Sequence, residues 1–388
     1  MRRVFGLCLV LLLCAGGMGA RQAADVSADA LAAAIPRLSS FDRAVRTDAS
    51  RTVRRAPAPL AVPALTRAAL DHADGYVRYR ALVLLAGFGE ASASAAMRQV
   101  IGDRNDRLRA VAYTWFELHT DPTMVPVLVG ALAREQSEFV RPALTPALAA
   151  YADSREARAA VLPLVMRGED VFRGVVIEAL GDHRAKDAVD AIIEVAKLEG
   201  PLQDDAVSAL GKIGDGRARE TLIDLQRSGP SAAQPAIAAG LYLLDVNRPA
   251  NEEYLKKSLA FAAANEGAQP LLRAAASALG VLAARGHAVS LLALFDAGVP
   301  AKDPPRAPIA LAIGTVALRN PRVLIDALEA RRDVDGAILL LRDAFDELSA
   351  EDYALERFFI EVRHAYWAAP AGSARRVLCE KLIQQLEF

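Results

Sequence analysis

Apolar residues recur along this chain at the spacing of one face of an α-helix. In residues 77–88 they occupy positions 77, 81, 82 and 85, and Gly87 and Gly89 then supply a stop. A second helix is expected over residues 122–133, because Asp121 is a suitable N-cap and Pro122 a suitable first helical residue. Alternating runs of Val, Thr and Tyr between Asn-Gly turns, which would indicate strands, are nearly absent. The pattern therefore predicts an all-α protein.

The helical pattern is repeated at a fixed interval. In three successive places an acid stands three positions before an arginine, and an apolar residue comes immediately before that arginine. These pairs are Asp106 and Arg109, Glu138 and Arg141, and Asp170 and Arg173. The three arginines are evenly spaced, and Arg78 extends the series backwards at nearly the same interval. A period of about 32 residues is typical of proteins that stack one supersecondary unit many times.

Two further phrases support the same period. The sequence Ala-Leu-Gly occurs at 179–181, 209–211 and 278–280, and the first two copies are separated by nearly one such interval. Residues 59–65 match residues 122–128 at an offset of two units. We place the glycine-rich residues 211–216 at a turn between two helices, where glycine suits a left-handed backbone.

A two-helix unit of this length with these phrases resembles the short HEAT-like repeats of phycobilisome-lyase-type proteins more than the longer HEAT and armadillo units. The resemblance covers about residues 45–300. It implies an α-solenoid of stacked helix pairs, in which the recurring acid and arginine tie neighbouring repeats together. The residues of this structural ladder would be Arg78, Asp106, Arg109, Glu138, Arg141, Asp170 and Arg173.

The chain divides into five predicted segments. They are a signal peptide (1–20), an N-terminal segment with a first helix (21–44), the repeat solenoid (45–298), a Pro-rich break (299–308) and a helical C-terminal cap or module (309–388). A solenoid needs an atypical end unit to cover its last apolar face, which is the role expected of the C-terminal segment.

The first twenty residues have the layout of a secretory signal. Arg2 and Arg3 precede an apolar run of about a dozen residues, which is shorter than the roughly 20 that a spanning helix needs, and small residues follow. We expect cleavage near Gly19 or Ala20 and export to the periplasm or cell envelope. A lipoprotein is disfavoured because leucine, not a small residue, precedes both Cys8 and Cys14.

Charge and composition narrow the expected partners. The chain has 388 residues, with 46 Lys and Arg against 47 Asp and Glu. Loss of Arg2 and Arg3 with the signal would leave 44 basic residues and a charge of −3, which argues against a nucleic-acid binder. No later apolar run reaches membrane-spanning length without charges, so membrane insertion after signal cleavage is not expected. Cys379 would be the one cysteine left, and a core position in a terminal helix suits it.

The sequence offers no recognisable catalytic constellation. It contains no zinc-binding pair of histidines, nucleophile elbow or phosphate-binding loop, so we predict no enzyme, cofactor or metal site. His72, His119 and His183 are expected at helix ends. A cluster of arginines in residues 43–55 could meet an anionic partner or lipid head groups, but a solvated first repeat is the favoured interpretation. Its members are Arg43, Arg46, Arg51, Arg54 and Arg55.

Three aromatic residues in one helix are candidates for an interface. Tyr113, Trp115 and Phe116 are too close in sequence for all three to face the same core, so at least one is expected to face the groove or the next repeat.

The leading functional hypothesis is an exported, non-enzymatic scaffold that binds a protein partner along a long, preformed concave groove. The alternative is a solenoid whose cavity binds a small apolar or tetrapyrrole-like ligand, which the resemblance to phycobilisome-lyase-type proteins implies.

Overall fold

A computed structural model describes residues 26–138, 140–348 and 351–387 of the chain. All regular secondary structure in these ranges is helical. The predicted signal peptide, with its cleavage site, Cys8 and Cys14, lies outside the described residues.

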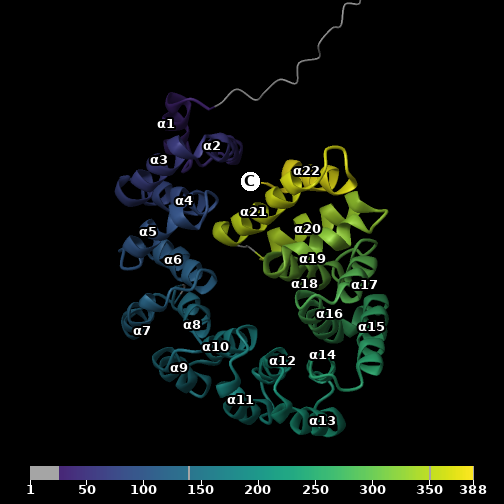
Figure 1. The fold of residues 1–388 in the computed structure, drawn as a ribbon. Helices are drawn as coiled ribbons and strands as arrows, with labels where there is room; N and C mark the ends of the chain where they lie inside the picture. Colours follow the sequence, from purple (N-terminus) through teal and green to yellow (C-terminus); the bar gives the residue numbers. More distant parts are fainter. Residues whose placement is uncertain (1–25, 139, 349–350, 388) are drawn as a thin grey trace, which may run out of the picture.

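The helices form two concentric layers that curl into a ring (Figure 1). The inner layer consists of α4 (Gly75–Ala86), α6 (Asp106–Leu118), α8 (Arg141–Ala149), α10 (Asp170–Asp182), α12 (Gln203–Ile213), α14 (Gln234–Leu243), α16 (Gln269–Ala284), α18 (Arg306–Arg319) and α20 (Val334–Leu348). The outer layer consists of α3 (Ala58–Asp71), α5 (Glu90–Val100), α7 (Val125–Arg134), α9 (Arg155–Val161), α11 (Val189–Ala196), α13 (Arg219–Ser228), α15 (Arg248–Ala264), α17 (Ala288–Gly298) and α19 (Pro321–Glu329). Successive inner helices pack on one another, which makes the fold an α-solenoid.

Two helices at each end of the chain and several 3-10 turns complete the fold. The N-terminal end is α1 (Ala28–Arg37) and α2 (Arg43–Arg55), and the C-terminal end is α21 (Asp352–Ala368) and α22 (Ala374–Leu386). Single 3-10 turns are η1 (Pro122–Met124), η2 (Leu162–Val165), η3 (Lys186–Ala188), η4 (Gly216–Ala218) and η5 (Glu266–Ala268).

Local capping explains where the helices begin. Asp74 accepts hydrogen bonds from the first turn of α4, and the predicted stop is present, because Gly87 caps the helix and Gly89 has a φ of +101°. Asp121 caps η1, which leads directly into α7, so the expected helix over residues 122–133 is present with a 3-10 first turn.

The glycines of the Ala-Leu-Gly phrases have a role that the sequence did not reveal. A Cβ on Gly181 would lie 2.7 Å from the Ala209 Cα, and a Cβ on Gly211 would lie 2.6 Å from the Gly240 Cα. Both glycines are inside inner helices, so the expectation that Gly211 belongs to a turn was wrong. Only Gly214, with a φ of +74°, supplies the left-handed turn position. The first two copies of the Ala-Leu-Gly motif therefore mark places where the backbone of one inner helix lies close to the backbone of the next.

The Pro-rich residues 299–308 interrupt the chain without interrupting the stack. They lie mainly between α17 and α18, and α16 packs directly on α18 across them. The stack then continues to α20.

The two ends of the solenoid meet and close the ring. Helix α21 turns back across the inner side and packs on α4 (Figure 1). Arg54 of α2 forms an ion pair with Glu356 of α21, and the two side chains are only 9% and 1% exposed. Arg80 of α4 reaches Asp352 at 2.8 Å. Tyr353 is buried in the core of the N-terminal half, although its helix follows the C-terminal half in sequence. The long open groove expected from the sequence is therefore closed at this end.

Among the described residues, no single helix combines the length and apolar composition needed to cross a membrane. The bent pair α18 and α19, with 117° between its members, meets that test by length and composition only.

Candidate ligand-binding cavity

Ring closure leaves a central cavity of about 860 Å³ on the inner side. Helices α6, α8, α10 and α12 supply one wall, α16 and α18 supply the facing wall, and α20 and α21 each add one residue. Apolar side chains that face it include Leu118, Val175, Val281, Leu311 and Leu318. A largely apolar hollow of this size falls within the range of about 300–1,000 Å³ that is typical of small-molecule sites.

Ion pairs cross the cavity and join its two walls. Arg319 of α18 lies 2.7 Å from Asp182 and 2.5 Å from Glu178, both on α10. Lys212 of α12 lies 2.9 Å from Asp182. Burial would raise the pKa of the Asp182 carboxyl, but Arg319 and Lys212 outweigh it and hold that pKa below its usual range. The pairs between α10 and α18 connect distant parts of the chain, so they stabilise the curl of the ring itself.

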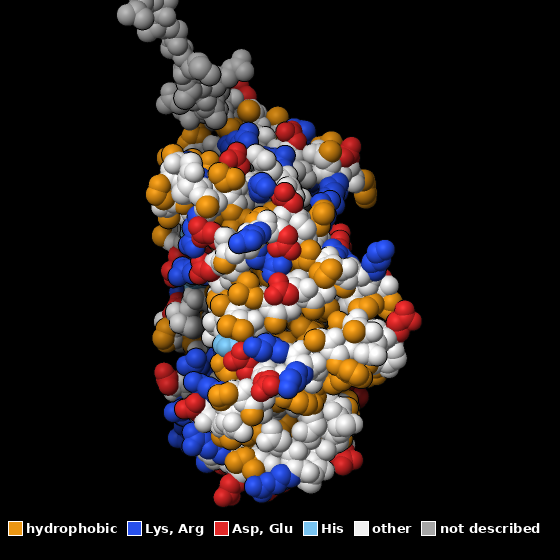
Figure 2. Space-filling view, turned by 90° about the vertical axis from the view of Figure 1, so that its right-hand side faces the viewer, with side chains coloured by type: hydrophobic (Ala, Val, Ile, Leu, Met, Phe, Trp, Pro, Cys, Tyr) orange, Lys and Arg blue, Asp and Glu red, His pale blue; other side chains and the backbone are white. Residues whose placement is uncertain are grey.

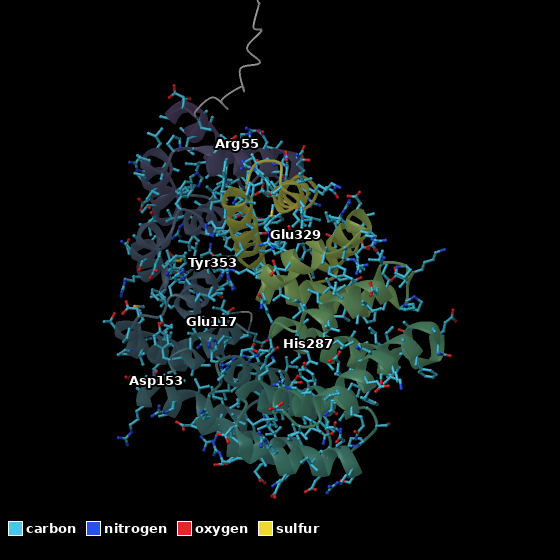
Figure 3. All side chains as sticks on the ribbon, turned by 45° about the vertical axis from the view of Figure 1, so that its right-hand side comes forward. Arg55, Glu117, Asp153, His287, Glu329 and Tyr353 are labelled. Carbon is cyan, nitrogen blue, oxygen red and sulfur yellow. The ribbon has the colours of Figure 1, made fainter. Side chains whose placement is uncertain are left out.

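A second polar pair lies where α21 reaches the cavity. The Nε2 atom of His183 and the Oε1 atom of Glu117 are 3.1 Å apart. Figure 3 shows Glu117 of α6 and Tyr353 of α21 in the middle of the ring. Burial, and secondarily the charge of Glu117, raise the pKa of the Tyr353 hydroxyl, so this phenol is neutral at pH 7.

Three charged lining residues have no such partner. Arg273 of α16, Glu347 of α20 and Arg357 of α21 line the cavity, and none forms an ion pair or hydrogen bond with another described residue. They leave cationic and anionic groups available to a polar part of a ligand.

Two arginines of the predicted ladder form ion pairs with acids that are not among the predicted ladder residues. Arg109 holds Glu135 with both arms of its guanidinium at 2.8 Å, and Arg78 pairs with Asp103. Each acid lies in the loop that follows the next outer helix, so each pair connects neighbouring units. Asp103 and Glu135 are themselves separated by the same interval as Arg109 and Arg141, and this recurrence is the signal that could have revealed them.

The other ladder residues lie elsewhere. Asp106 accepts a hydrogen bond from Ser137 at 3.4 Å, and Arg173 pairs with Asp170 at 2.9 Å. Arg141 is exposed and lies over the ring of Phe172, 4.5 Å from its centroid. Glu138 is exposed and forms no ion pair within the described part of the chain. The recurring acid three positions before the arginine is thus an ion-pair partner only in the last of the three phrases.

Comparison with known proteins agrees with this architecture. Residues 62–149, which run from α3 to the end of α8, match the family of HEAT repeats. The ion pairs of Arg78 with Asp103 and of Arg109 with Glu135 lie within the matched residues.

One solved structure has a limited likeness to this chain. The complex of CpcE and CpcF of phycocyanin lyase from Nostoc sp. PCC7120 is 19% identical, with a TM-score of 0.40, over 65% of this chain and 94% of that chain. A likeness of that size bears on neither activity nor partners. A search among curated proteins finds no match.

The aromatic cluster of α6 is buried. Tyr113, Trp115 and Phe116 are each no more than 2% exposed, so none of them faces the groove, and of the two expected positions only the one against a neighbouring repeat remains. The reason is that α6 is covered on several sides, by α4, α5 and α8, so that neighbouring side chains can point in different directions and still be buried.

Histidines and the cysteine have structural positions. His72, His119 and His183 are the C-cap residues of α3, α6 and α10, as expected. Cys379 is buried in α22, and burial raises the pKa of its thiol. No group of three or more His, Cys, Asp or Glu side chains within the described ranges is arranged to hold a metal ion.

Proposed function

We propose that this chain is an exported, non-enzymatic HEAT-repeat protein that binds a small, largely apolar ligand in its central cavity. The observation that carries the proposal is the closed ring. Helix α21 packs on α4 and covers the inner side, and the space left is a hollow of about 860 Å³ rather than a long open groove. Contact of α21 with α4 shortens the open inner face, whereas a stable protein interface needs roughly 800 Å² of accessible surface on each side.

The non-enzymatic assignment rests on what the charged groups near the cavity already do. Arg319 is held in ion pairs with Glu178 and Asp182 of the facing wall, and Lys212 pairs with Asp182 within one wall. His183, the one histidine that lines the cavity, is hydrogen-bonded to Glu117. The Arg319 pairs hold the two walls together, and a preformed apolar site between rigid walls binds without a large ordering cost.

The binding proposal is tested by filling the cavity. Thr315 of α18 lines it, and its hydroxyl donates to the Leu311 carbonyl at 2.9 Å. We expect Thr315→Trp to weaken binding of the neutral fluorophore N-phenylnaphthylamine by about tenfold or more, because the indole occupies the ligand's volume. Fluorescence titration measures the effect. Thr52→Trp is the matched control, since Thr52 makes the same type of bond to Asp48 outside the cavity.

Equal binding by wild type and Thr315→Trp would place the fluorophore outside the cavity and would contradict the proposal. The visible absorption spectrum of freshly purified protein separately tests for a tetrapyrrole-like ligand.

Export to the periplasm or cell envelope rests on the layout of residues 1–20. Fusion of residues 1–25 to an alkaline phosphatase lacking its own signal tests it, because that enzyme becomes active only after export. An inactive fusion that accumulates inside the cell would refute this part of the proposal.

Binding of a protein partner is a second candidate function, and its docking site would lie outside the predicted concave groove. Trp367, near the end of α21, is 72% exposed and lies beside Tyr366, and the guanidinium of Arg376 covers both rings. Exposed aromatic groups with a neighbouring arginine are typical interface anchors. Photo-crosslinking from position 367, with the exposed Phe261 position on α15 as control, would test whether a discrete protein docks there.

A further inference from the structure

The structure separates the basic cluster of α2 into two groups. Arg46 and Arg54 are used by the fold. The Arg46 guanidinium donates to the Ser40 carbonyl at 2.7 Å, and Arg54 is buried against Glu356. These two arginines need no external partner.

The other three arginines have no such role. Arg43, Arg51 and Arg55 form no ion pair or hydrogen bond with any other described residue. The two acids of this region are occupied, since Asp42 caps α2 and Asp48 pairs with Arg37 at 2.9 Å. With about 100° of rotation per residue, the three arginines fall within roughly 120° on one side of α2. The cationic groups are therefore neither neutralised nor spread around the helix.

An exposed aromatic side chain stands at the start of the same helix. Phe41, in the turn before α2, is 104% exposed, which makes it the most exposed of the large apolar residues in the described ranges. Phe41 comes two residues before Arg43, so an exposed apolar group stands at the start of a row of cations about 18 Å long, from about 1.5 Å per residue. Elsewhere, on the face in Figure 2, acidic and basic side chains lie interspersed.

We infer that Phe41 and the Arg43, Arg51 and Arg55 side chains form a docking surface for an anionic phospholipid membrane. The chemistry is complementary: guanidinium groups attract phosphate head groups, and a single aromatic ring inserts at the boundary between head groups and acyl chains. The surface belongs to α2 at the N-terminal end of the ring, and Figure 3 shows Arg55 there, away from Glu117 at the cavity. The inference is independent of what the cavity binds.

The experiment is cosedimentation of the full mature chain with vesicles of equimolar phosphatidylglycerol and phosphatidylcholine, against vesicles of phosphatidylcholine alone. We expect the protein to bind the anionic vesicles and to lose most of this binding at high salt. The double variant R51Q/R55Q should bind about thirtyfold more weakly, because each arginine near an anionic surface strengthens binding about five- to sixfold. Phe41→Ser should weaken the binding that remains at high salt.

The control is R332Q/R342Q, which removes two exposed arginines that form no ion pair with the described residues. Arg332 lies in the loop before α20, and Arg342 lies on α20. Thermal melting of each variant checks that the fold is intact. Equal binding of neutral and anionic vesicles, an unchanged R51Q/R55Q, or an equal loss in R332Q/R342Q would overturn the inference. Tighter binding to duplex DNA than to anionic vesicles would also overturn it, because the surface would then recognise negative charge in general and not a membrane.

Discussion

At the scale of single residues, the most consequential group is a carboxylate that no local pattern singles out. Glu356 is 1% exposed and receives Arg54 on one side and Arg363, at 2.6 Å, on the other. Burial would raise the pKa of Glu356, but the two guanidinium groups outweigh it and hold that pKa at about 2, against an ordinary value of 4.5. The folded state therefore binds this proton less readily than the unfolded chain does.

Glu356→Gln should lower the free energy of unfolding at pH 7 by about 3 kcal/mol, because it leaves the guanidinium groups of Arg54 and Arg363 with Glu387 as their one remaining carboxylate partner among the described residues. The ion pair contributes fully above pH 4.5, and its contribution is lost as the pH falls towards 2, where the native carboxyl takes up its proton. Urea unfolding of wild type and variant across this pH range checks the prediction, and the two should converge in acid. A difference that is constant with pH would show that lost packing, not lost charge, is the cause.

Glu347→Gln is the matched control for this experiment. Glu347 also lies at the inner side of the ring but forms no ion pair with the described residues, so its substitution should leave the free energy of unfolding within about 0.5 kcal/mol of wild type.

At the scale of elements, the sequence predicts the helices well and their contacts less well. The N-cap Asp121 lies directly before the helical pattern that it starts, so the local sequence is enough to predict it. The partner of Arg109 could not be chosen from spacing along one helix, because Glu135 lies in another loop, beyond the next outer helix. Burial of Trp115 likewise depends on which helices surround α6, and residue order within α6 does not specify that.

The glycines of the inner helices give a test at this scale. Gly181→Ala and Gly211→Ala should each destabilise the protein by about 1–3 kcal/mol, because the added Cβ meets backbone that cannot move aside. Gly280→Ala is the internal comparison from the same phrase, since its Cβ would lie 3.4 Å from the Ala312 Cβ. There the gain in helix propensity, up to about 1 kcal/mol, should offset the contact. Equal effects at all three positions, in urea unfolding, would mean that close approach is not what these glycines provide.

At the scale of the whole molecule, closure of the ring is the feature that could not be predicted from the sequence. Repeat spacing predicts a solenoid but does not set its total curvature, which accumulates from small rotations between units. Arg54 and Glu356 are 302 residues apart, and neither belongs to a repeated phrase. Closure converts the expected groove into a cavity, so the candidate site itself is a product of curvature and not of any one motif.

Tyr353 provides the sharpest test of closure, because it is a residue of α21 buried in the core of the N-terminal half. Tyr353→Ala should cost about 3–5 kcal/mol and should also separate the two ends of the ring. Small-angle X-ray scattering well below the melting temperature would then show a larger maximum dimension. Tyr151→Ala is the matched control: Tyr151 is also buried, but its hydroxyl bonds within the N-terminal half, to the Phe116 carbonyl at 3.1 Å. Both variants should lose stability, and only Tyr353→Ala should change shape. If Tyr353→Ala keeps the dimensions of wild type, the ends are held by the ion pairs of α2 and α4, and the aromatic contact follows closure instead of causing it.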